Sequence, residues 1–99
     1  MIRHVVSLRL GAENAAIRDD HSARLAAALR ALPAQIPEVL RYEVGQNSLG
    51  EGKNWDLVII GDYADADALE TYKAHPAHRQ VVAYIDEVAA ERVTVDFLV

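Results

Sequence analysis

The chain opens with Ile2-Arg3-His4-Val5-Val6-Ser7-Leu8-Arg9-Leu10, a run in which side chains of one kind recur at every second position. The even-numbered side is apolar apart from His4, and the odd-numbered side carries two arginines and a serine. A period of two is typical of a β-strand, because successive side chains point to opposite faces of a sheet. The run is therefore predicted to be the first strand, with His4 on the inward face.

An amphipathic helix is predicted after Gly11. Its apolar side is formed by residues three or four positions apart, namely Ile17, His21, Leu25, Ala28, Leu29 and Leu32. The pattern ends before Pro33, since proline removes a backbone donor and restricts the residue that precedes it. Strands are predicted at residues 39–44 and 55–63, and the glycine-rich segment 45–52 between them is interpreted as a hairpin connection.

Two helical pieces and a last strand complete the chain. Asp65 is predicted to cap a short helix that contains Tyr72, and Pro76 is predicted to be the first residue of the next helix. Residues 91–99 alternate again and are predicted to be a strand. The order βαββαβ predicts an α+β fold, ferredoxin-like, with an antiparallel four-stranded sheet in the order four-one-three-two and helices on one face.

The length and charge of the chain limit the kinds of partner that it is expected to bind. A chain of 99 residues has room for one domain, residues 1–99, and a short chain gains from pairing with a copy of itself. The formal charge of −5 argues against a nucleic-acid partner, and no apolar run approaches the roughly 20 residues that cross a bilayer. Cysteine is absent, and the N-terminus does not resemble a signal peptide, so a cytoplasmic location is expected.

Four polar residues are predicted to lie on inward faces: His4, Tyr72, His78 and Asp96. Antiparallel pairing of the first and last strands brings His4 near Asp96, with Arg92 and Thr94 further along. A neutral histidine can take a proton near pH 7, a tyrosine hydroxyl can donate to an enolate oxygen, and a carboxylate can fix an imidazole tautomer. The set suits proton abstraction next to a carbonyl. A purely structural role for the same residues stays open.

No metal site is predicted. His75 and His78 are three positions apart, but Pro76 lies between them and no matching carboxylate-histidine motif occurs elsewhere. His75 precedes a proline at a helix start, where capping is the expected role.

Several segments together resemble the stress-responsive dimeric α/β-barrel (Dabb) domains. They are Ile2-Arg3-His4-Val5-Val6, Gly45-Gln46-Asn47, Trp55-Asp56-Leu57-Val58, the segment from Leu69 to His78 with its Tyr72-x-x-His75-Pro76-x-His78 spacing, and Val95-Asp96-Phe97. The resemblance covers almost the whole chain. It implies a ferredoxin-like subunit whose sheet packs on a partner's sheet, giving a homodimeric barrel.

Plant members similar to olivetolic acid cyclase imply a role for each matched residue. His78 would be the base of an intramolecular aldol cyclisation of a linear polyketide, Tyr72 would stabilise the enolate, and Asp96 would orient His78. No metal or organic cofactor is implied. The pocket between sheet and helices would bind a small molecule through six further residues: His4, Val6, Leu8, Ile59, Arg92 and Thr94.

Two departures point to a different ligand, and two other functions remain open. The cyclase has a histidine where this chain has Leu57, and aliphatic residues where it has Arg92 and Thr94. A more polar pocket is therefore expected, in which Arg92 meets a carboxylate or an enolate. Other members resemble structural stress proteins that form stable rings. A cofactor-free oxygenase or a degradative enzyme of related dimeric barrels is the third reading.

Overall fold

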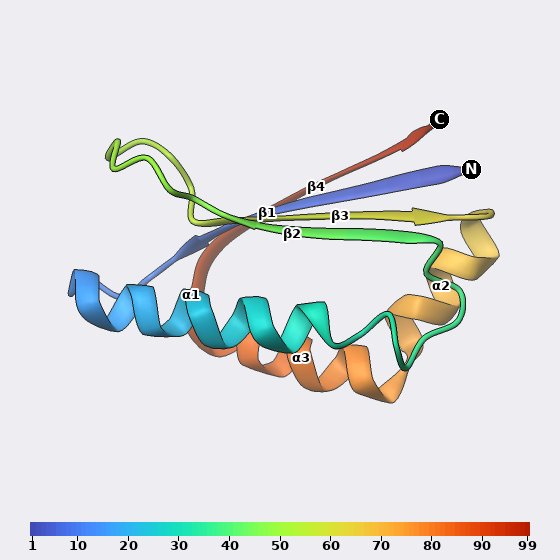
Figure 1. Ribbon diagram of the computed structural model, residues 1–99, viewed down its shortest axis with the longest axis horizontal. Helices are drawn as coiled ribbons and strands as arrows, with labels where there is room; N and C mark the ends of the chain where they lie inside the picture. The colour runs from blue at the N-terminus through green and yellow to red at the C-terminus, as the bar shows by residue number, and fades with distance from the viewer.

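The computed structural model describes residues 1–99 and has one sheet covered on one face by helices (Figure 1). The elements, in chain order, are β1 (Ile2–Leu10), α1 (Ala15–Arg30), β2 (Arg41–Gln46), β3 (Leu57–Tyr63), α2 (Ala66–Ala74), α3 (Pro76–Val88) and β4 (Ala89–Leu98). The four strands are antiparallel and follow the order β2-β3-β1-β4. This order confirms the predicted ferredoxin-like α+β fold, with α1 and α3 side by side beneath the sheet.

The helix starts follow from local chemistry. Asp65 caps α2 by accepting a hydrogen bond from the Ala68 N–H at 2.8 Å, as predicted. His75 ends α2 in an extended conformation, which suits a residue that precedes proline, and its ring accepts from the Ala77 N–H at 3.0 Å. Pro76 is then the first residue of α3, where its missing donor costs nothing. The sharp α2–α3 junction sets the position of His78.

Strand ends differ from the prediction by two residues. β2 begins at Arg41 because the Val39 N–H still bonds to the Ile36 carbonyl in the preceding turn. β2 also runs on to Gln46, through Gly45, which was expected in the connection. β4 begins at Ala89, directly after α3. Backbone hydrogen bonds set these ends, and residue preference does not report them.

Strand register brings the inward-facing residues together. His4 lies opposite Asp96 of β4 and Gly61 of β3, which confirms the predicted approach of His4 and Asp96. Thr94 and Arg92 follow on the same face of β4 because side chains alternate along a strand. His4 is buried with the alternate apolar residues of β1, as the opening pattern predicts.

The opposite face of the sheet is uncovered and carries apolar side chains on β4 beside ion pairs such as Arg3–Asp62. Val93, Val95 and Phe97 of β4 are 51%, 58% and 44% exposed, and Val5 lies directly opposite Val95. A contiguous apolar surface of this kind is typical of an interaction site. No helix has the length and apolar character needed to cross a bilayer.

Candidate functional site

A cavity of about 630 Å³ lies between the inward face of the sheet and the helices. Its walls come from three strands and all three helices: His4, Val6, Leu29, Ile59, Tyr72, Lys73, His78, Arg79, Val82, Ala83, Ile85, Asp86, Arg92 and Thr94. The structure thus brings together seven of the nine predicted site residues. Leu8 is not among them, because it is fully buried in the core, and its predicted role in ligand binding is wrong.

His78 has a fixed tautomer. Its Nδ1 lies 3.0 Å from the Lys73 carbonyl, and a carbonyl can only accept, so Nδ1 carries the proton. In the neutral ring Nε2 is then an unprotonated acceptor. Burial lowers the pKa of His78 below its ordinary value, and the positive charges of Lys73 and Arg92 act in the same direction. The ring is therefore a neutral base at pH 7.

Asp96 binds His4, and this corrects its predicted contact with His78. The carboxylate of Asp96 meets Nδ1 of His4, the residue directly opposite in the β1–β4 register. A short aspartate side chain reaches its cross-strand neighbour, whereas His78 on α3 already takes its orienting bond from the end of α2. Asp96 itself is not part of the cavity wall. His4 forms a carboxylate–histidine pair that fixes its tautomer independently of His78.

Tyr72 lies at the centre of a ring cluster. Its side chain is nearly inaccessible, its ring centroid is 4.3 Å from that of His78, and its hydroxyl is 2.8 Å from the hydroxyl of Tyr42. Burial raises the pKa of Tyr72, so the hydroxyl keeps its proton at neutral pH. The Tyr63 ring packs 5.0 Å away, and its buried hydroxyl has no hydrogen-bond partner.

Tyr42 and Tyr63 are site neighbours that sequence reasoning missed. Tyr42 pairs with Gly61 across β2 and β3, so its side chain points inward beside Tyr63, two positions further along β3. Gly61 is needed here because a Cβ at this position would lie 2.7 Å from the Tyr63 hydroxyl. The signal available in sequence was the alternation of the second strand, which places Tyr42 on the same face as Val44.

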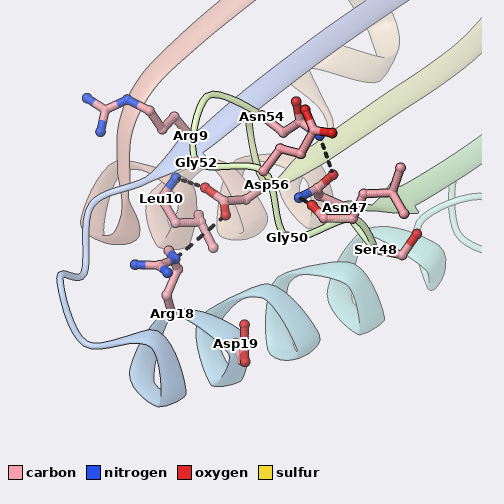
Figure 2. A pocket seen from close by; sticks show the side chains of 12 residues that line it. Arg9, Leu10, Arg18, Asp19, Asn47, Ser48, Gly50, Gly52, Asn54 and Asp56 are labelled. Atoms are coloured by element: carbon pink, nitrogen blue, oxygen red, sulfur yellow. Dashed lines mark hydrogen bonds and ion pairs between the residues drawn. The ribbon is translucent and has the colours of Figure 1, made fainter.

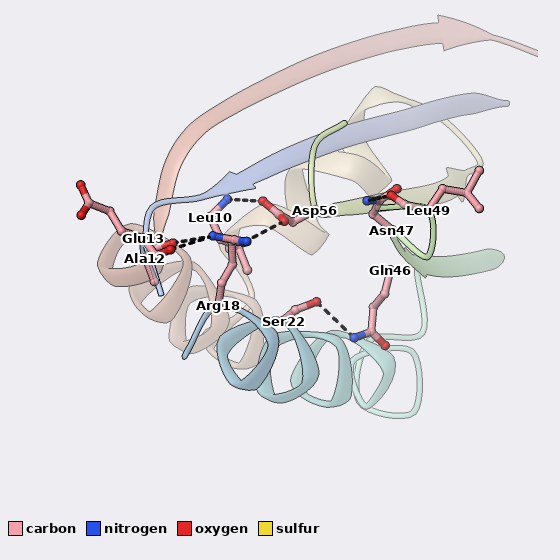
Figure 3. A network of polar contacts seen from close by, with 9 residues as sticks. All are labelled: Leu10, Ala12, Glu13, Arg18, Ser22, Gln46, Asn47, Leu49 and Asp56. Atoms are coloured by element: carbon pink, nitrogen blue, oxygen red, sulfur yellow. Dashed lines mark hydrogen bonds and ion pairs between the residues drawn. The ribbon is translucent and has the colours of Figure 1, made fainter. Parts of the chain in front are cut away.

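A second hollow of about 400 Å³ lies at the other end of the sheet, between the 47–56 loop, α1 and the end of β1 (Figure 2). We call it the polar cleft; its lining includes Arg9, Arg18, Asp19, Asn47 and Asp56. Asp56 accepts from the Leu10 N–H at 2.7 Å and lies 3.8 Å from the Arg18 guanidinium (Figure 3). Arg18 also donates to the Ala12 carbonyl at 2.9 Å, and Arg9 is bonded to Glu91. These contacts anchor the loop.

Comparison with known proteins agrees with this architecture. The fold places this chain in the class of ferredoxin-like α+β proteins. Within this class, the chain matches the family model of the stress-responsive A/B barrel domain over residues 2–99. The chain belongs to this family. An uncharacterised protein of Streptomyces coelicolor is 37% identical over 91 residues, which are 90% of this chain and 91% of that protein.

Two solved structures are described as dimeric ferredoxin-like proteins of unknown function. The Thermobifida fusca protein has a TM-score of 0.86 at 32% identity, over 99% of this chain and 90% of its own. The Bacteroides fragilis protein has a TM-score of 0.91 at 24% identity, over 99% and 95%. A hydroxynitrile lyase from Passiflora edulis shares the fold, with a TM-score of 0.79 at 12% identity over 99% and 92%.

Proposed function

We propose that the cavity binds a small carbonyl compound and catalyses cofactor-independent enolate chemistry, with His78 as the base. One observation carries the proposal: the Lys73 carbonyl holds the proton on Nδ1 of His78, so Nε2 is a free acceptor in the wall of a cavity. A base needs an unprotonated nitrogen at the working pH, and the lowered pKa of His78 supplies it. Enolate chemistry needs no metal when the base and the enolate donor are both positioned.

Tyr72 is the proposed donor to the enolate oxygen. Its ring contacts His78, and its proton stays in place at neutral pH because burial raises its pKa. The bond to Tyr42 is between two hydroxyls, so Tyr42 can donate to Tyr72 while Tyr72 donates to a ligand. Such a chain of donors strengthens each member in a low-dielectric interior.

The proposed reaction is an aldol addition within one polyketide-like substrate. His78 removes a proton from the carbon between two carbonyl groups, and the electrons of that C–H bond form the enolate. The enolate carbon then attacks a third, more distant carbonyl of the same molecule, whose C–O π bond breaks as the C–C bond forms, and the new alkoxide takes a proton. His78 returns the proton, so no oxidant or reductant is consumed. His4, which lines the same cavity and is held by Asp96 from outside the cavity wall, is the proposed second proton carrier.

The test is α-proton exchange in deuterated buffer. Wild-type protein is mixed with a panel of 1,3-dicarbonyl compounds, and the loss of their methylene signals is followed by NMR. We expect exchange above the buffer rate, and a loss of about 10²-fold or more in His78→Ala, the usual contribution of a general base. His75→Gln is the matched control, since His75 caps α3 outside the cavity wall. No exchange above buffer, or equal exchange in His78→Ala, refutes the proposal.

A structural role for the same cluster is the second candidate, and the buried Tyr42–Tyr72 bond favours it. The two functions differ in stability. Residues of an active site often reduce stability, so a catalytic role predicts that His78→Ala has almost no effect on the free energy of unfolding. A structural role predicts a loss of several kcal/mol, because the side chain then contributes to packing. Thermal unfolding of His78→Ala and Tyr72→Phe separates them.

We also propose that the chain is a homodimer that covers the apolar outer face of β4. The exposed Val93, Val95 and Phe97 support this arrangement, and the solved relatives of this fold are described as dimeric. Light scattering should give twice the chain mass for wild type and the monomer mass for Val95→Asp. Leu49→Asp is the matched control, because Leu49 is exposed on the 47–56 loop, away from that face. A monomeric wild type contradicts the proposal.

A further inference from the structure

The mouth of the cavity is positively charged in a protein that is negative overall. Lys73, Arg79 and Arg92 line the cavity with a single carboxylate, Asp86. The chain as a whole carries fifteen acidic residues against ten lysines and arginines. A local excess of cations against the overall balance marks a place where an anion is attracted and held.

Arg79 is the only arginine of the chain without a partner. Arg3, Arg9, Arg18, Arg24, Arg30, Arg41 and Arg92 each make a side-chain ion pair or hydrogen bond. The guanidinium of Arg79 makes neither, although its residue lies one position after His78 and lines the same cavity. A guanidinium has five donors arranged to grip a carboxylate. Arg79 therefore has all of its binding capacity available.

The other two cations are loosely held. Arg92 lies 3.2 Å from Asp86, and Lys73 lies 3.4 Å from Glu70. Both pairs are largely exposed, and exposed pairs contribute little, so a ligand can compete for them. The pKa of His78 is lowered mainly by burial, and the charges of His4, Lys73 and Arg92 act in the same direction because they disfavour a positive imidazolium. A field that opposes a cation stabilises an anion.

The cavity wall also has an apolar part. Leu29, Ile59 and Ile85 are buried residues of the core that also line the cavity. A ligand that fits must combine an anionic end, a hydrocarbon middle and a polar end that reaches His78. The wall therefore offers two kinds of polar group, the guanidinium groups of Arg79 and Arg92 and the imidazole and phenol of His78 and Tyr72.

We propose that the ligand of this cavity is a carboxylate, held at Arg79 and Arg92, and that the substrate class is a keto acid. This inference rests on the proposed function, because it assigns the carbonyl to His78 and Tyr72 and adds the group that anchors the other end. Arg79 is a specificity residue: it selects the acid over its neutral analogues and takes no part in proton transfer.

The test compares an acid with its amide. Phenylacetate and phenylacetamide, which have the same shape, are titrated into ¹⁵N-labelled protein, and dissociation constants are taken from shifts of cavity residues. We expect phenylacetate to bind at least about tenfold more tightly, and Arg79→Gln to lose most of that difference, as removal of a charge-assisted hydrogen bond does. Raising the salt concentration should weaken phenylacetate alone.

Arg24→Gln is the control variant. It removes the same charge from the chain, but Arg24 pairs with Asp20 on the exposed surface of α1, outside the cavity. Equal binding of acid and amide, or an equal loss in Arg24→Gln, overturns the inference. Should Arg79→Gln not fold, Arg92→Gln answers the same question from β4.

The two proposals fail in different ways. Acid-selective binding that depends on Arg79, without any deuterium exchange, would support the carboxylate site and refute the proposed enolate chemistry. The opposite result is deuterium exchange that is as fast with neutral diketones as with keto acids and is unchanged in Arg79→Gln. That result would support the enolate chemistry and refute the carboxylate site.

Discussion

The polar cleft and the cavity lie at two ends of the same helix-covered sheet, and they use charge differently. In the polar cleft, Arg18 and Asp56 make contacts within the chain (Figure 3). Arg9 is bonded to Glu91. In the cavity, Nε2 of His78 and the guanidinium of Arg79 have no partner in the chain. The number of polar groups does not separate the two regions. The chemistry of the unpartnered groups does: the cavity has an imidazole nitrogen and a guanidinium, whereas the polar cleft has the carboxylate of Asp19.

The largest expected effect comes from a substitution that disrupts the polar cleft and leaves the cavity unchanged. Asp56→Ala leaves the Leu10 N–H, at the end of a central strand, without its acceptor and removes the carboxylate beside Arg18. An unsatisfied buried donor costs about 1–3 kcal/mol, so we expect a loss of that size in urea unfolding, with ligand binding at the cavity unchanged. Asp19→Ala, in the same cleft but without a hydrogen bond or ion pair, should stay within about 0.5 kcal/mol. Equal effects of the two variants would show that Asp56 is no anchor.

The next effect separates two tyrosines of the ring cluster. Tyr42→Phe removes the partner of the Tyr72 hydroxyl and should cost about 1 kcal/mol of unfolding free energy. Tyr63→Phe removes a buried hydroxyl that has no partner, and should be neutral or slightly stabilising. Chemical denaturation measures both. A larger loss in Tyr63→Phe than in Tyr42→Phe would mean that the 2.8 Å contact does not hold the cluster together.

The smallest effect is the pH dependence that comes from His78. Its pKa in the folded protein lies below its ordinary value of about 6.5, so the unfolded chain takes up the proton first as the pH falls. Stability should therefore decline from about pH 6.5 down to the folded pKa and then stop changing through this group. Burial is the main cause of the lowered pKa, and the charges of His4, Lys73 and Arg92 lower it further, which extends the decline to lower pH.

The His78→Gln variant supplies the reference for that profile. Glutamine does not titrate, so subtracting its unfolding free energy from that of wild type at each pH isolates the histidine. The unfolding free energy of wild type should fall relative to that of His78→Gln as the pH falls. A difference that does not vary between pH 7 and 5 would place the pKa of His78 at its ordinary value.

Strand alternation was enough to predict the geometry of one contact. His4 and Asp96 each stand on the inward side of an alternating run, and antiparallel pairing of the chain ends places them opposite each other. The cap at Asp65 and the helix start at Pro76 depend equally on local sequence, and the structure has both. Residue identity within a few positions determines such features, which is why sequence reasoning finds them.

The partner of Asp96 and the role of Tyr42 required the assembled fold. The proposed His78–Asp96 contact depended on how far α3 stands from β4, a distance that no spacing along the chain encodes. The Tyr42–Tyr72 bond joins residues thirty positions apart on β2 and α2. The polar cleft was missed because Asp56 acts through a backbone N–H of β1, which leaves no mark on residue preference.

The β1–β4 pair has a consequence for how binding depends on concentration. His4 lines the cavity and is paired with Asp96, while the next pair along the two strands, Val5 and Val95, is on the opposite face of the sheet. One peptide unit therefore separates the cavity from the face that a second copy would cover. β4 is an edge strand, and a partner that holds it in place also holds the carboxylate against His4. In the proposed homodimer, dimerisation and ligand binding would then be thermodynamically linked: dilution below the dimer dissociation constant would weaken ligand binding, and the ligand would in turn tighten the dimer.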